Sequence, residues 1–207
     1  MIWCSPPQDR PYSLSLYDPF WAEAQDLNMP LSLPSITGTG PESRLIVKDP
    51  MDGYIRSTVL SHEVQRGSLM NQGTHTVLIF SGVLECFPRL KCVSAENEVG
   101  WLTFFLQTLD QAQDEDRYLY PSPLTMKPSE YFRRQCYATF IDDPVGVATR
   151  HFIGADNIMW SSGYPHTVST WPHSQEVVAR DFQGVPEKEK WQMVRNNAMA
   201  LYSLDLN

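Results

Sequence analysis

The residues best suited to chemistry in this sequence follow its short apolar runs. Glu96 comes just after the run at 90–94, before any helical pattern begins, and His166 ends the stretch IMWSSGYPH at 158–166. A carboxylate and an imidazole can pass a proton between them or ligate a divalent ion. We therefore interpret Glu96 and His166 as candidate catalytic residues, and Glu96 also as a candidate metal ligand. A structural role is the alternative for His166.

The stretch at 158–166 has the pattern of a buried strand that ends in a site. Its apolar residues give way to two serines, a glycine, a tyrosine and a proline before the histidine. In parallel α/β folds, ligands meet the carboxyl ends of the strands. Trp160, Ser162 and Tyr164 are therefore candidate substrate-binding residues, and Gly163 stands where a reactive side chain would be expected.

Two other acidic positions have a structural interpretation. Glu98 and Asp143 each stand directly before a helical pattern. A carboxylate at that place stabilises the helix N-terminus through the helix dipole. We expect both residues to cap helices rather than to take part in catalysis.

These side chains must be held by short strands that alternate with helices. Apolar runs predict the strands, and apolar residues at helical spacing predict the helices between them. The predicted strands are at 1–5, 29–35, 90–94, 135–141 and 157–161. The predicted helices are at 18–28, 74–87, 99–114, 144–152, from about 172, and at 186–204, where Trp191, Val194, Ala198 and Leu201 form the expected buried stripe.

This alternation predicts an α/β fold with a parallel sheet. Two architectures agree with it, an open doubly wound sheet and part of a (β/α)8 barrel. A complete barrel usually needs about 250 residues, and no glycine-rich nucleotide turn follows a strand here. We expect one domain over residues 1–207, with an irregular insertion at 46–74.

Charge and composition exclude several classes of partner. The net charge of −8 argues against a nucleic-acid partner. No apolar run approaches the roughly 20 residues of a membrane span, and the N-terminus does not have the pattern of a signal peptide. The four cysteines are too scattered for a disulfide framework or a structural zinc site. They predict reduced thiols in a cytoplasmic protein.

Several segments in order along the chain carry a resemblance. They are DRPYSLSLYDPFWAEAQDLNMPLSL, KCVSAENEVGWLTFFLQTLD, SEYFRRQCYATFIDDPVGVATRHFIGADNIMW, YPHTVSTWP and NNAMALYSL. Together they resemble the amidohydrolase-related family of metal-dependent hydrolases and decarboxylases, which includes aminocarboxymuconate semialdehyde decarboxylase. The resemblance covers nearly the whole chain except about 46–74. It implies a (β/α)8 barrel that holds a divalent metal, usually zinc, at its strand ends.

The resemblance also assigns the strands. Residues 1–5 look like the fourth strand of the barrel and 158–166 like the eighth. The chain would then carry strands 4 to 8 and would be truncated at its N-terminal side. The family's first-strand pair of metal ligands, a histidine and a glutamate, would be absent from it.

The remaining ligand positions of the family are changed as well. The resemblance places a histidine at the end of the fifth strand, where this chain has Pro34 and Ser35, and an aspartate at Gly163. Glu96 matches the sixth-strand position, and His166 is left nearby as a substrate contact. A catalytic zinc typically uses three protein ligands. We therefore expect metal catalysis to be lost in this chain alone.

Two functions follow as expectations. By resemblance, the chain is a metal-dependent hydrolase or decarboxylase of a small, for example aromatic, carboxylate, with a degraded metal site. The alternative is a pseudoenzyme, a truncated barrel that acts as a binding or interaction protein. Because a partial barrel has open sheet edges, and such edges promote pairing with other chains, we expect self-association as a homo-oligomer.

Overall fold

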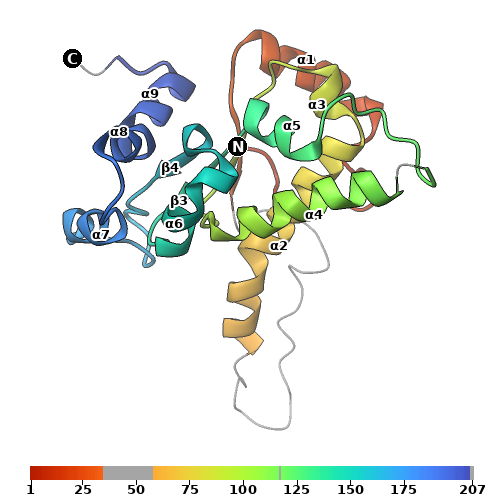
Figure 1. Cartoon of the computed structure of the whole chain (residues 1–207). Coiled ribbons are helices and arrows are strands. Elements are labelled where there is room, and N and C mark those ends of the chain that lie inside the picture. The colour runs from red at the N-terminus through yellow and green to blue at the C-terminus, as the bar shows by residue number, and fades with distance from the viewer. Residues whose placement is uncertain (35–57, 117, 206–207) are drawn as a thin grey trace, which may run out of the picture.

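The computed structural model describes residues 1–34, 58–116 and 118–205 (Figure 1). Within these residues the sheet has four parallel strands in the order β1-β2-β3-β4. The strands are β1 (Leu31–Pro34), β2 (Cys92–Ala95), β3 (Cys136–Phe140) and β4 (Ile158–Trp160). Because each strand lies beside the next one in the chain, every crossover connects direct neighbours, as the alternation of strands and helices predicted.

Helices fill the crossovers between the strands, and others precede β1 or follow β4. They are η1 (Ser15–Tyr17), α1 (Asp18–Asp26), α2 (Thr58–Phe80), α3 (Val83–Cys86), α4 (Gly100–Asp116), α5 (Pro128–Gln135), α6 (Pro144–Ile153), η3 (Ala155–Asn157), α7 (Ser174–Asp181), α8 (Glu187–Trp191), the π-helical turn η4 (Gln192–Asn196) and α9 (Asn197–Tyr202). In Figure 1, α7, α8 and α9 gather beside β4, and α1, α3 and α5 lie at the other side of the molecule. Helix α4 packs on both α5 and α6.

The two faces of the sheet are buried to different extents. Side chains alternate between faces along a strand. Cys92, Ala138 and Ile158 point to the helix side and belong to one large buried cluster. On the opposite face Val93 and Met159 form a small cluster with a single buried residue of α9, Leu201. The main core therefore lies between the sheet and the helices.

The N-terminal segment differs from its prediction. Residues 1–5 form no regular strand; Ser5 makes an isolated bridge, and the backbone N–H of Ile2 donates to the carbonyl of Ser32 at 3.0 Å. The segment therefore lies beside β1 without extending the ladder. Two prolines follow it directly, and proline has no N–H to donate to a ladder.

The helix predicted at 74–87 also differs. Helix α2 begins at Thr58, so residues 58–74 of the predicted insertion are helical, while residues 46–57 lie outside the described part of the chain. Gly82 has a φ of +82° and separates α2 from α3. This φ is in the left-handed region, which glycine tolerates because it has no Cβ. The prediction missed both the early start and this break.

The last helix is interrupted by the π-helical turn. A π-turn inserts a residue into the helical repeat and rotates the residues that follow. Within the predicted buried stripe, the prediction for Trp191 is wrong, since this residue is 50% exposed. Leu201 is buried as predicted. Met193 and Asn197 take buried places instead, at 1% and 2% exposure. Among the described helices, none is both long and apolar enough to cross a membrane.

Candidate active site at the strand ends

Glu96 and His166 lie together at the carboxyl edge of the sheet. Glu96 directly follows β2, and His166 lies in the loop after β4, so the pair reaches across the end of β3. Glu96 Oε2 is 3.5 Å from His166 Nδ1, and the two side chains are 34% and 66% exposed. The pair is therefore open to solvent and to a small ligand, and it can hold or transfer one proton.

Glu96 is held in an unusual backbone conformation. Its φ is +60°, and that of Glu98 is +54°, both in the left-handed region. Such a conformation costs a residue other than glycine on the order of 1 kcal/mol, and it persists only where the surroundings impose it. Here the N–H of Glu96 donates to Thr139 Oγ1 at 2.8 Å, which ties the end of β2 to β3.

His166 is positioned by a loop that closes on itself. The carbonyl of Ser162 accepts hydrogen bonds from the Thr170 N–H and from Ser169 Oγ, both at 2.9 Å. Within the loop, the N–H of His166 donates to the carbonyl of Gly163 at 2.9 Å. These bonds join the two ends of the loop and turn His166 back over the sheet edge toward Glu96.

Gly163 has no room for a side chain. Its φ is +71°, and a Cβ atom at this position would clash with the carbonyl oxygen of Val168 and lie 2.9 Å from Ile141 Cδ1. The first of these atoms belongs to the backbone, so the clash could be relieved only by moving the loop. The glycine is therefore required by the closed loop that carries His166.

The neighbouring carboxylate of Asp143 has a structural role, as predicted. It accepts backbone N–H bonds from Val99, Gly100 and Gly146, each at 2.7 Å. Asp143 is the N-cap of α6, and the first two bonds satisfy donors at the start of α4. One buried carboxylate therefore caps two helices.

Glu98 does not cap α4, which corrects the prediction. Its carboxylate accepts the N–H of Ile141 at 3.0 Å and so fixes the end of β3. Burial raises the pKa of Glu98 above its usual value, and the nearby charge of Asp143 adds to this, while the hydrogen bond from Ile141 opposes it. The cap of α4 comes instead from Asp143, far along the chain.

Of the three predicted substrate contacts, Ser162 and Tyr164 lie in the loop that carries His166, whereas Trp160 points to the helix side of the sheet. Trp160 packs against the core on the helix side and donates its indole N–H to the Ile141 carbonyl at 3.2 Å. Ser162 closes the loop through its carbonyl. Tyr164 is exposed and packs edge-to-face on Trp171, with ring centroids 5.9 Å apart. Trp171 was missed in the sequence, where only its place in the same loop could have indicated it.

The described residues do not fit a catalytic metal. They contain no group of three or more histidine, cysteine, aspartate or glutamate side chains that could hold an ion. Glu96 and His166 together provide two possible metal ligands. A catalytic zinc typically has three protein ligands. Pro34 ends β1 without a donor side chain, Gly163 has none, and Ser35 lies outside the described residues.

A family profile and several solved structures are similar to this chain. The amidohydrolase family profile matches residues 3–204 of the chain. Among solved structures, 5-carboxyvanillate decarboxylase from Sphingomonas paucimobilis is similar with a TM-score of 0.73 and 22% identity, over 96% of this chain and 56% of that one. No curated protein sequence matches the chain.

Two further solved structures are similar to the same extent. The 5-carboxyvanillate decarboxylase from Novosphingobium aromaticivorans, complexed with manganese and 4-hydroxy-3-methoxy-5-nitrobenzoic acid, has a TM-score of 0.71 and 21% identity, over 98% of this chain and 56% of that one. The 2,6-dihydroxybenzoate decarboxylase from Rhizobium has a TM-score of 0.69 and 20% identity, over 95% of this chain and 58% of that one. The chain thus spans little more than half the length of these structures.

These similarities confirm the predicted architecture. The parallel sheet and its surrounding helices form part of a (β/α)8 barrel, and β1 to β4 are consecutive strands of it. In such a barrel the carboxyl ends of the strands carry the active site. Glu96 and His166 lie at that end.

Proposed function

Because the chain belongs to the amidohydrolase family, whose profile covers residues 3–204, we propose that its strand ends bind a small carboxylate and descend from the site of a hydrolase or decarboxylase. The observation that carries this proposal is the Glu96–His166 pair, 3.5 Å apart at the edge of the sheet. The similar solved structures support aromatic carboxylates with hydroxyl groups as the first candidates, since their names and ligands include 5-carboxyvanillate and 2,6-dihydroxybenzoate.

The two side chains have different roles in this proposal. A protonated His166 attracts the ligand's carboxylate and can deliver a proton. Glu96 accepts a proton from His166 or from water. The exposed Tyr164–Trp171 pair provides an aromatic surface in the loop that also carries His166. Hydrolysis and decarboxylation both need a group that moves a proton at the reacting atom.

The described part of this chain lacks enough ligands for the divalent metal of the family. Similar structures hold manganese, and a bound divalent ion would supply charge stabilisation for a carboxylate. The described strand ends offer too few donors for it. We therefore propose that this chain alone binds the carboxylate without efficient turnover, and that any metal-dependent activity requires ligands from outside the described residues.

Ligand binding provides the first test. Tryptophan fluorescence is titrated with 2,6-dihydroxybenzoate and 5-carboxyvanillate, for the wild type and for His166→Asn. Loss of the cationic partner should weaken binding about 10-fold, as expected for one charge-assisted hydrogen bond. The matched control is His173→Asn, because His173 faces Glu176 at 3.3 Å in a similarly exposed pair that includes neither Glu96 nor His166. Equal effects of the two variants, or no binding of either ligand, would contradict the proposal.

A second measurement separates an enzyme from a binding protein. Release of CO2 from the same ligands is followed with added manganese or zinc and with a chelator. Metal-dependent turnover that Glu96→Gln abolishes would establish the enzyme. Binding without turnover, with less than about a tenth of an equivalent of bound metal, would establish the non-catalytic alternative, which the closed loop around Gly163 favours.

Location and assembly belong to the same proposal. We propose a cytoplasmic protein, from the pattern of its cysteines; Cys4, Cys92 and Cys136 are buried, whereas Cys86 is exposed. Self-association through the sheet edges is also proposed. Sedimentation at several protein concentrations tests it, and one species of monomer mass throughout would rule it out.

A further inference from the structure

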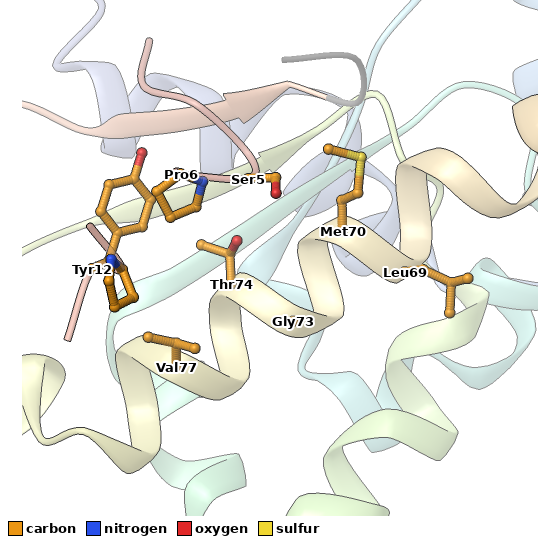
Figure 2. A pocket seen from close by; sticks show the side chains of 9 residues that line it. Ser5, Pro6, Tyr12, Leu69, Met70, Gly73, Thr74 and Val77 are labelled. Atoms are coloured by element: carbon orange, nitrogen blue, oxygen red, sulfur yellow. The ribbon is translucent and has the colours of Figure 1, made fainter. Parts of the chain in front are cut away.

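A cavity separate from the strand ends lies between the N-terminal segment and α2 (Figure 2). Its volume is about 220 Å³. The residues that line it are Ser5, Pro6, Pro11, Tyr12, Leu69, Met70, Gly73, Thr74 and Val77. Neither Glu96 nor His166 is among them, so this cavity is distinct from the candidate carboxylate site.

Gly73 is the unusual residue in the wall of the cavity. It lies in the interior of α2, where glycine is less favourable than alanine because it loses more backbone entropy. Its backbone does not adopt a positive φ, and a Cβ atom placed on it would meet no heavy atom within 4 Å. Neither backbone conformation nor close packing therefore calls for a glycine here. Gly73 is exposed, so its missing side chain leaves open space where the cavity meets solvent.

The chemistry of the walls indicates a neutral ligand. None of the nine lining residues is charged, so a carboxylate or an ammonium group would lose its hydration without gaining a partner of opposite charge. Most of the wall is apolar, from prolines and aliphatic side chains. The polar atoms include the hydroxyl groups of Ser5 and Thr74. Thr74 Oγ1 donates to the Cys4 carbonyl and therefore faces a ligand as an acceptor.

The size of the cavity limits the ligand further. An apolar cavity of about 150 Å³ is sufficient to bind benzene, and pockets for drug-sized ligands have about 300–1,000 Å³. A volume of about 220 Å³ thus suits one ring with a small substituent. We propose that this cavity binds a small neutral molecule, a monocyclic phenol or an alcohol of similar size, whose body lies against Gly73 and whose hydroxyl group donates to Thr74.

The test compares a neutral probe with a charged one of similar size. Binding of phenol and of benzoate is measured by calorimetry and by the shift of the melting temperature, for the wild type, Gly73→Ala and Gly73→Leu. Phenol should bind the wild type, and Gly73→Leu, whose side chain fills the cavity, should weaken it at least 10-fold. Benzoate binding should not respond to Gly73→Leu, because any benzoate site would be the one at Glu96 and His166.

Gly73→Ala is the control for folding. Since its methyl group meets open space, the better helix propensity should raise the melting temperature by about 2–4 °C. A phenol affinity that Gly73→Leu leaves unchanged would overturn the proposal, as would absence of phenol binding. If phenol does not bind and Gly73→Leu changes the sedimentation coefficient, the cavity is an interface between copies of the chain, which also overturns it.

Failure of this proposal and failure of the proposed function are distinguishable. Phenol binding that is lost in Gly73→Leu but kept in His166→Asn assigns the two ligands to two sites. Loss of carboxylate binding in His166→Asn leaves the phenol result untouched.

Discussion

Two kinds of carboxylate stand side by side at the carboxyl edge of the sheet. Asp143 is 8% exposed and accepts three backbone N–H groups, and Glu98 accepts the N–H of Ile141. Glu96, two residues from Glu98, has its carboxylate 3.5 Å from the imidazole of His166 and is partly open to solvent. The first kind holds strand and helix ends in place, and the second is left available for a ligand.

The difference shows what decides the role of an acidic residue. All three residues follow strands and precede helices, so local sequence context is nearly the same. The role depends on whether unpaired backbone N–H groups lie within reach in the folded chain. At position 163, by contrast, the folded loop leaves no space for the side chain of an acidic residue.

The largest effect is expected for Asp143→Ala. Three N–H groups at the starts of α4 and α6 lose a charged acceptor. Since a hydrogen bond to a charged group contributes about 1.5–3 kcal/mol, we expect the free energy of unfolding to fall by about 5 kcal/mol in denaturant titrations. Asp142→Ala is the control, because its pair with Arg180 is exposed and should contribute little. Similar losses in both variants would remove the distinction between the two kinds of carboxylate.

Gly163→Asp should have the next largest effect. The aspartate must take a positive φ and displace the Val168 carbonyl, so we expect a loss of about 3 kcal/mol and no gain of metal binding. In Gly184→Asp the strain at a φ of +78° is similar, but nothing lies within 4 Å of the added Cβ. A loss of about 1 kcal/mol is expected there. Calorimetric titration with manganese checks the metal, and one equivalent bound by Gly163→Asp would show that the loop can accommodate a ligand after all.

Glu98→Gln should change how stability depends on pH. Burial raises the pKa of Glu98 in the folded state, so the folded chain binds more protons than the unfolded chain above the ordinary value of 4.5. The contribution of Glu98 to stability is therefore complete below pH 4.5 and is lost as the pH rises through the raised pKa. Glutamine keeps an acceptor for the Ile141 N–H and does not titrate. Relative to the wild type, the variant should become more stable as the pH rises from acidic to neutral.

Urea unfolding at a series of pH values measures this effect. The quantity of interest is the difference in the free energy of unfolding between Glu98→Gln and the wild type. A difference that stays constant with pH would show that the carboxyl of Glu98 titrates alike in the folded and unfolded chains.

Glu96→Gln should have the smallest effect on stability. Its partner His166 is 66% exposed. Exposed pairs contribute little, so a change below about 0.5 kcal/mol is expected. The same change should alter carboxylate binding at the strand ends. A loss of about 2 kcal/mol or more in thermal unfolding, the scale of a buried charged hydrogen bond, would place Glu96 with the structural carboxylates.

The parallel sheet and the place of Glu96 and His166 at strand ends could be predicted from the sequence, because both depend on local patterns. Alternating runs predict consecutive parallel strands, and parallel strands bring their carboxyl ends to one edge. The cap that Asp143 provides for α4 could not be predicted, since its donors lie 44 and 43 residues away. The carbonyl of Val168 beside Gly163 is likewise a property of the folded loop. Trp191 was misplaced because the π-turn breaks the regular period on which the prediction relied.

Asn197, which the π-turn brings to a buried place, has a consequence for assembly. Its Nδ2 donates to the carbonyls of Ala155 and Ile158, both at 2.7 Å. The N–H of Ser161 points to β3, so by alternation the backbone groups of Ile158 and Trp160 point outward from β4. An added strand needs a row of outward N–H and C=O groups. Here the side-chain amide of Asn197 already occupies the carbonyl of Ile158. Within the three residues of β4, only Trp160 then keeps both of its outward groups, so a partner chain would gain a very short ladder here, and the proposed self-association would need another edge.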